Sequence, residues 1–250
     1  MRLIKHISDL FFRSAGAAAA ALLLLGVVAT GSTLALAEET AAPAATEAAQ
    51  APSLLRYREG EHYQKVPIPV SPASKDGVEV VEFFSYGCVH CFNFDPMVER
   101  WSQQNSDAVA FRRVPAVFNE SWAFLAQAFY TAEALSVGEA LHGPLFRAIH
   151  TDHINIGDPK LMAQLFRKHG SVSEDDFALA FDSFGVRSKV QQATGHSRAL
   201  RLRAVPSMVV AGQYVVDGSM VQGGNQEMLE VVEFLIDKVA EEKAAASAGQ

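Results

Sequence analysis

The residues with the clearest capacity for chemistry are the only two cysteines, Cys88 and Cys91, separated by two residues. A strand-like run ends just before them, and a helical pattern begins with them. Cys88 is therefore expected at a helix N-terminus, where free backbone N–H groups and the helix dipole favour a thiolate. Because the thiolate is the form that attacks a disulfide, the pair predicts thiol–disulfide exchange.

Each cysteine is expected to have its own role. Cys88 is predicted to be the exposed nucleophile, and Cys91, one turn further along, the thiol that closes the disulfide. A protonated His90 between them would stabilise a thiolate further. A structural disulfide remains an alternative, although so short a loop constrains the unfolded chain little. Half of a zinc site is another, but no second Cys-x-x-Cys pair exists and the spacing of His150 and His153 is uncommon for zinc, so no metal is expected.

The elements around the pair follow from residue patterns. The β-branched and aromatic run from Val78 to Phe84 predicts a strand buried on both faces. Apolar residues then recur at helical steps from Cys88 to about Gln104, and Val109 to Val114 is a second strand candidate. This order is typical of a β-α-β unit.

The next part of the chain, from Asn119 to about Leu202, has helical periodicity only. Asp158-Pro159 predicts one helix start, and Ser173 with Asp176 resembles a capping box before a helix that includes Phe184.

Strand patterns return after this block. Met208 to Val210 and Tyr214 to Val216 predict a hairpin, and a closing helix is expected from about Gln226 to Ala240. The sequence therefore predicts an α/β fold with one sheet and a helical insertion.

Composition limits the function classes. The 250 residues are 49% hydrophobic and 20% charged, as in globular proteins, and the formal net charge is −7. This acidic balance argues against nucleic-acid binding through bulk positive charge. Two cysteines cannot form a scaffold of several disulfides.

The N-terminal region resembles a secretory signal peptide. Basic residues precede an apolar stretch from Ala15 to Ala29, and Ala35-Leu36-Ala37 forms a small-x-small site before Glu38. Residues 1–37 are therefore predicted to be cleaved during export; an uncleaved membrane anchor is the alternative. Residues 38–53 are predicted to be a flexible linker and residues 243–250 a disordered tail.

Two segments resemble those of the DsbA-type thiol:disulfide oxidoreductases, thioredoxin-fold proteins of the bacterial periplasm. One is EFFSYGCVHCFNFDP (82–96), and the other is AVPSMVVAGQYVV (204–216). The resemblance implies a thioredoxin-like domain made of residues 54–118 and 204–242, with residues 119–203 as an inserted helical domain.

The resemblance also implies roles for single residues. Cys88 and Cys91 would be the catalytic pair, and Val89 with His90 the dipeptide that tunes the redox potential, although the best-known members have proline at the position of Val89. Pro206 would follow Val205 through a cis peptide bond, in a loop beside the disulfide that binds substrate.

Glu82 matches a buried acid that the family places beneath the disulfide. A charge inside an apolar strand is costly unless it has a partner or a task. A proton relay to Cys91 is one interpretation, and a salt bridge or an outward-facing position is the other.

The resemblance implies a monomeric periplasmic oxidase that donates its disulfide to reduced, partly unfolded exported proteins. It would be reoxidised by a DsbB-type membrane quinone reductase and would need no cofactor beyond the Cys88–Cys91 disulfide. Two alternatives stay open: a disulfide reductase or isomerase that is kept reduced, and a client-binding chaperone or maturation factor.

Overall fold

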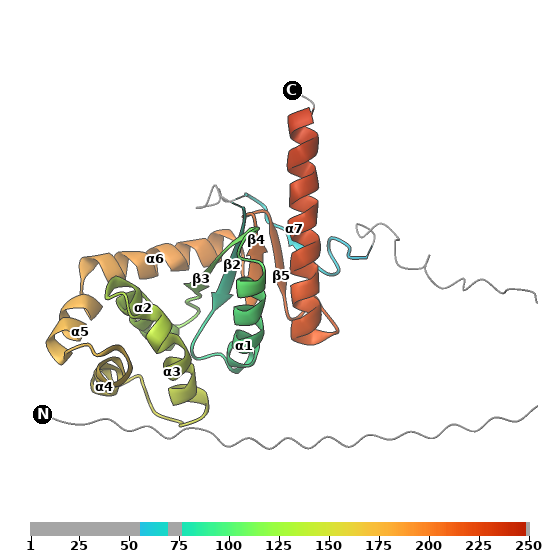
Figure 1. The fold of residues 1–250 in the computed structure, drawn as a ribbon. Helices are drawn as coiled ribbons and strands as arrows, with labels where there is room; N and C mark the ends of the chain where they lie inside the picture. The colour runs from blue at the N-terminus through green and yellow to red at the C-terminus, as the bar shows by residue number, and fades with distance from the viewer. Residues whose placement is uncertain (1–55, 70–76, 249–250) are drawn as a thin grey trace, which may run out of the picture. The chain divides into compact units, whose positions relative to one another are not determined.

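A five-stranded sheet forms the centre of the computed structural model, which describes residues 56–69 and 77–248 (Figure 1). The strand order is β1-β5-β4-β2-β3, in which β2 and β3 are parallel and the other neighbours are antiparallel. The strands are β1 (Gln64–Lys65), β2 (Val78–Phe84), β3 (Val109–Pro115), β4 (Ser207–Val210) and β5 (Tyr214–Asp217).

The central strand β2 is buried along its whole length, as its apolar sequence predicts. Val78 and Val80 face a core that α1 (Val89–Gln104) and α7 (Gly224–Ala248) cover. Val81 and Phe83 face the opposite core, together with residues of α6 (Phe184–Ala199). The alternation of a strand thus places helices on both faces of the sheet.

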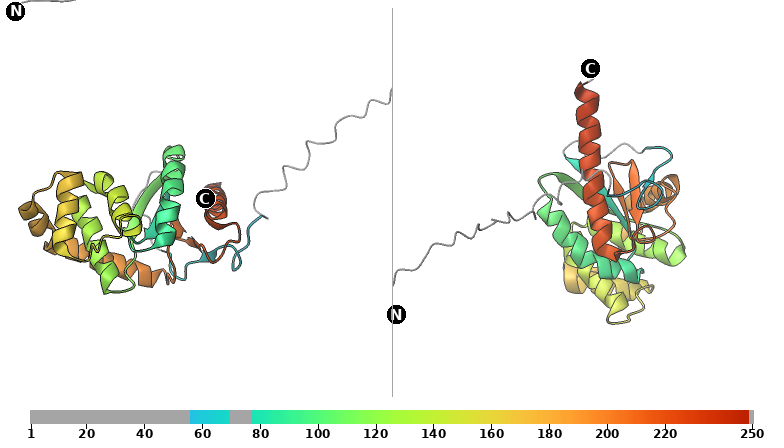
Figure 2. Two further views of the ribbon diagram at one scale, coloured as in Figure 1. Left: turned by 90° about the horizontal axis from the view of Figure 1, so that it is seen from below. Right: turned by 90° about the vertical axis from the view of Figure 1, so that its right-hand side faces the viewer.

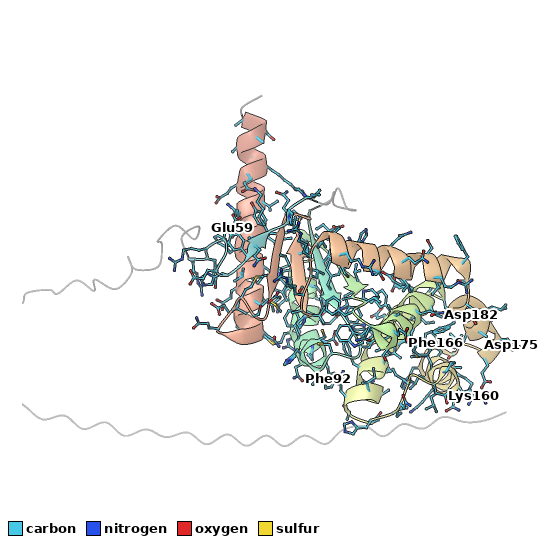
Figure 3. The ribbon with its side chains drawn as sticks, turned by 180° about the vertical axis from the view of Figure 1, so that it is seen from behind. Glu59, Phe92, Lys160, Phe166, Asp175 and Asp182 are labelled. Carbon is cyan, nitrogen blue, oxygen red and sulfur yellow. The ribbon has the colours of Figure 1, made fainter. Side chains whose placement is uncertain are left out.

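The predicted helical insertion lies beside β3 (Figures 1 and 2). Its apolar side chains form a core that also includes Phe84 at the end of β2 and both cysteines. Phe166, labelled in Figure 3, lies within this core with Leu141 and Leu145. Besides α6, the insertion contains α2 (Glu120–Ala134), α3 (Gly138–His150), α4 (Pro159–Gly170) and α5 (Glu174–Phe181). The predicted caps at Asp158 and Ser173 are present, since each side chain accepts a hydrogen bond from a backbone N–H of its helix.

The structure differs from the sequence-based expectations at three places. The predicted helix through Phe184 is divided, because Ser183 caps a new helix, and Phe184 is exposed. The chain expected to be a disordered tail from Lys243 is helical through Ala248. The short strand β1 was not predicted; it pairs with β5 at the sheet edge. The predicted signal peptide and linker lie outside the described residues.

Candidate redox site

The cysteine pair lies where β2 passes into α1. Cys88 is the N-cap of α1, and its Sγ accepts a hydrogen bond from the Cys91 N–H at 3.3 Å. The Cys88 N–H donates to the Ser85 carbonyl at 3.0 Å, which holds the loop between strand and helix. The sulfur of Cys88 therefore faces the N-terminal N–H groups of a helix, as the sequence predicted.

Gly87 brings the helical insertion against this loop. A Cβ at this position would lie 2.9 Å from the Trp122 Nε1 of α2, a distance that a side chain cannot adopt without displacing the indole. Glycine is thus needed here for close approach, and the loop before Cys88 is packed against the insertion.

The two thiols, both free in this structure, differ in accessibility. Cys88 is 8% exposed, and Cys91 is completely buried. Cys88 is therefore the sulfur that solvent reaches, although it is much less exposed than the sequence suggested.

The environment shifts the pKa values of the two thiols in opposite directions. The hydrogen bond from the Cys91 thiol, with further ones from the backbone N–H groups of Cys91 and His90, lowers the pKa of Cys88 to about 6. Burial raises the pKa of Cys91, and the neighbouring charges of Cys88 and Glu82 raise it further. The reduced pair thus holds one thiolate at neutral pH, on Cys88.

A proline loop from the far end of the insertion completes the site. The Val205–Pro206 peptide bond is cis, as expected. The Cys88 Sγ lies 3.4 Å from the Val205 carbonyl oxygen, so the fold brings together residues that are 117 positions apart. Binding of a substrate strand by this loop stays a prediction.

Glu82 is a buried acid with a partner. Its side chain is 2% exposed, and the Nε of Arg113, its neighbour on β3, donates to its carboxylate at 3.0 Å. Burial raises the pKa of Glu82 to about 7, with Arg113 opposing this shift and Asp95 adding to it. The expected salt bridge is therefore present, and the raised pKa also suits the proton-relay interpretation, so the two hypotheses are compatible.

Arg113 joins three carboxylates from two elements. Its Nη2 donates to Asp95 at 3.2 Å and to Glu99 at 3.0 Å, both on α1. His142 of α3 lies 2.8 Å from Asp95 through its Nε2. A pocket of about 460 Å³ opens beside these residues.

A model of the DSBA-like thioredoxin domain matches residues 79–230, which include both cysteines and the proline loop. The chain belongs to this DsbA-like family. Its thioredoxin-like fold with a helical insertion is therefore shown, and its enzyme class is that of a dithiol–disulfide oxidoreductase.

Curated relatives and solved structures agree with this assignment. The thiol:disulfide interchange protein DsbA of Azotobacter vinelandii is 38% identical over 180 residues, 72% of this chain and 83% of that protein. The crystal structure of Pseudomonas aeruginosa DsbA has a TM-score of 0.70 at 34% identity and covers 76% of this chain and 97% of that one. The oxidoreductase DsbA of Xylella fastidiosa has a TM-score of 0.68 at 29% identity and covers 74% and 98%.

The Val89-His90 dipeptide between the two cysteines of this DsbA-like protein lies at the surface. Val89 is 49% exposed, and His90 is also exposed. Val89 is the first residue of α1, a helix position that readily accepts proline. Phe118, 42% exposed, stacks on Trp122 and adds apolar surface near Gly87.

Sequence reasoning missed the residues around Glu82. Arg113 carried a usable signal, because an arginine inside a strand next to a buried glutamate strand is a candidate partner. His142 and Asp95 carried none, since only the packing of α3 against α1 brings them together.

Neither a metal-binding cluster nor a membrane-spanning helix occurs in the part of the chain that the structure describes. Within 56–69 and 77–248, no group of three or more His, Cys, Asp or Glu side chains is placed to hold a metal ion. Over the same residues, no helix is long and apolar enough to cross a membrane.

The asymmetry of the two thiols is testable in the reduced protein. We expect a single thiolate to titrate between pH 4 and 9, with a midpoint near the Cys88 pKa of about 6, and the Cys88→Ala variant to lose this transition. Thiolate absorbance against pH measures it. Because the folded pKa lies below the ordinary value of 9.0, the thiolate's contribution to stability is complete above pH 9 and is lost as the pH falls to about 6. A midpoint near 9 would contradict this assignment.

Proposed function

We propose that this DsbA-like protein is a periplasmic dithiol oxidase that donates a Cys88–Cys91 disulfide to reduced exported proteins. The observation that carries the proposal is the different placement of the two sulfurs: the Cys88 Sγ caps α1 and accepts the Cys91 N–H, whereas Cys91 is completely buried. A stabilised Cys88 thiolate favours the reduced protein and so makes its disulfide a strong oxidant.

The reaction proceeds by two exchanges. A client thiolate attacks the Cys88 Sγ, the Cys88–Cys91 bond breaks, and the Cys91 sulfur leaves and takes up a proton. A second client thiolate then attacks the client sulfur of the mixed disulfide, and Cys88 leaves as a thiolate. Two electrons pass from the client to the protein, and the client gains one disulfide.

Glu82 is the proposed source of the proton for Cys91. Its pKa of about 7 allows it to hold a proton at the pH of the reaction and to release it to a stronger base. The electrostatic influence of Glu82 on Cys91 supports this role.

Client recognition is proposed for the surface around Cys88. The exposed apolar side chains Val89 and Phe118 suit a partly unfolded chain, and the Val205 carbonyl lies beside the reacting sulfur. By resemblance, a DsbB-type membrane quinone reductase would use the same surface to restore the disulfide of a monomeric, exported protein, with no further cofactor.

The equilibrium reduction potential of the cysteine pair tests the proposed direction. We expect a value much closer to the about −120 mV of a strong dithiol oxidant than to the about −270 mV of thioredoxin. Titration in glutathione buffers, with the fraction of reduced protein read by thiol labelling, gives the potential. A value near that of thioredoxin would favour a reductase instead, and a Cys88→Ser/Cys91→Ser variant that still supported client folding would favour a chaperone.

A further inference from the structure

Helix α3 contacts Tyr86, which lies two residues before Cys88, at three points. The His142 Nδ1 lies 3.0 Å from the Tyr86 hydroxyl, and the His150 Nε2 lies 2.8 Å from the Tyr86 carbonyl oxygen. The Phe146 ring packs edge-on against the Tyr86 ring, with centroids 5.0 Å apart. These three residues recur every fourth position, so they form one stripe of α3 that faces the active-site loop.

The same stripe reaches α1. His150 stacks on Phe92, with ring centroids 5.1 Å apart, and Phe92 is labelled in Figure 3 at the end of α1 that faces the insertion. His142 also contacts α1, through the 2.8 Å hydrogen bond between its Nε2 and Asp95. The His142 imidazole thus joins the loop before Cys88 to the carboxylate that shares Arg113 with Glu82.

The direction of these hydrogen bonds follows from chemistry. Burial raises the pKa of Tyr86, so its hydroxyl remains a donor. The Asp95 carboxylate can only accept, so the His142 Nε2–H donates to it; in the tautomer with the proton on Nε2, the Nδ1 accepts from the Tyr86 hydroxyl. Asp95 is therefore held between two donors, His142 and Arg113.

We propose that His142 is a positioning residue of the redox centre. Its hydrogen bond to Asp95 limits how strongly Asp95 attracts the Arg113 guanidinium away from Glu82. The position of this cation in turn determines the proton affinity of Glu82. The proposal deepens the proposed function, because it concerns the acid assigned to serve Cys91. Without the His142 hydrogen bond, the Asp95 carboxylate interacts more strongly with Arg113, and this interaction draws the guanidinium away from Glu82.

Other charged residues surround this cluster, and none of them is substituted in the test. Besides Asp95 and Arg113, the pocket beside His142 is lined by the charged groups Glu99 of α1, Arg112 of β3, Glu133 of α2 and Glu139 of α3.

A pair of variants that differ by one methylene group separates this role from packing. The His142→Gln side chain is long enough to donate to Asp95, whereas the shorter His142→Asn side chain is not. His196→Asn makes the same change at an exposed position of α6 and is the matched control.

The titration of Glu82 is measured directly in the oxidised protein, labelled with ¹³C at the glutamate side-chain carboxyl carbon; the Glu82→Gln variant assigns the signal. We expect His142→Asn to raise the Glu82 midpoint by about 0.5 to 1 pH unit from its starting value, a fraction of the effect of a whole neighbouring charge. His142→Gln and the control are expected to keep the wild-type midpoint.

An unchanged Glu82 midpoint in a folded His142→Asn variant would overturn the proposal, as would an equal shift in His142→Gln. Should His142→Asn fail to fold, Asp95→Asn is the second measurement: it removes the charge that raises the pKa of Glu82, so the midpoint must fall. An Asp95→Asn protein with an unchanged midpoint would also overturn the coupling. No client or reductase is present in this titration, so it can fail while the oxidase function stands, and the reverse.

Discussion

Replacing Cys91 with alanine is expected to leave the protein joined to its clients as stable mixed disulfides. Cys91 is completely buried, and its raised pKa keeps it a thiol in the reduced protein. In the variant the Cys88 thiolate attacks an existing disulfide of an exported protein; one client sulfur joins Cys88, and the other leaves as a thiolate. Without Cys91 no internal thiol displaces the client from Cys88, so each complex persists until a client thiol or an external thiol resolves it. Disulfide-linked complexes on non-reducing gels, after expression in a bacterial periplasm, measure the effect.

The Cys88→Ala variant is the matched control and should form no such complexes, because the remaining sulfur is not accessible. Oxidation of a dithiol peptide should be lost in both variants. Complexes that form through Cys91 in the Cys88→Ala variant would show that the roles of the two sulfurs are reversed.

The local parts of the fold were predictable because their signals are local. The run from Val78 to Phe84 is apolar apart from Glu79 and Glu82 and has no continuous polar face, so a strand buried on both sides suits it. The caps at Asp158 and Ser173 depend on residues within one helical turn. The division before Phe184 was missed, since a second N-cap, Ser183, lies within an otherwise continuous helical pattern.

The parts of the site that are local in sequence were predictable, but the contacts between distant segments were not. The spacing of Cys88 and Cys91 indicates thiol–disulfide exchange, and the motif around Pro206 indicates its place beside the disulfide. The network around Arg113 depends on the register of β2 with β3 and on the packing of α3 against α1. Neither leaves a periodic signal in one sequence, so the residues that control Glu82 could be found only in the structure.

Replacing Arg113 with methionine is expected to cost about 3 to 5 kcal/mol of unfolding free energy at pH 8, the usual effect of removing one member of a buried ion pair. Methionine fills similar space but leaves the Glu82 carboxylate, 2% exposed, without its cation. Urea denaturation of the oxidised protein, followed by circular dichroism, measures the loss. Arg100→Met, the same change at an exposed position of α1, should cost less than about 0.5 kcal/mol.

The pH dependence of this loss identifies its cause. The folded pKa of Glu82, about 7, already lies above its ordinary value of 4.5, and removal of Arg113 raises it further. The charged carboxylate therefore lowers stability as the pH rises above 4.5, and a proton on Glu82 relieves this cost at lower pH. The deficit of Arg113→Met should be larger at pH 8 than at pH 5 by up to about 1.4 kcal/mol, because pH 8 lies only about one unit above the parent pKa of Glu82, and adding Glu82→Gln should remove this difference. A deficit that is equal at both pH values would mean that Arg113 stabilises the fold through Asp95 and Glu99 rather than through Glu82.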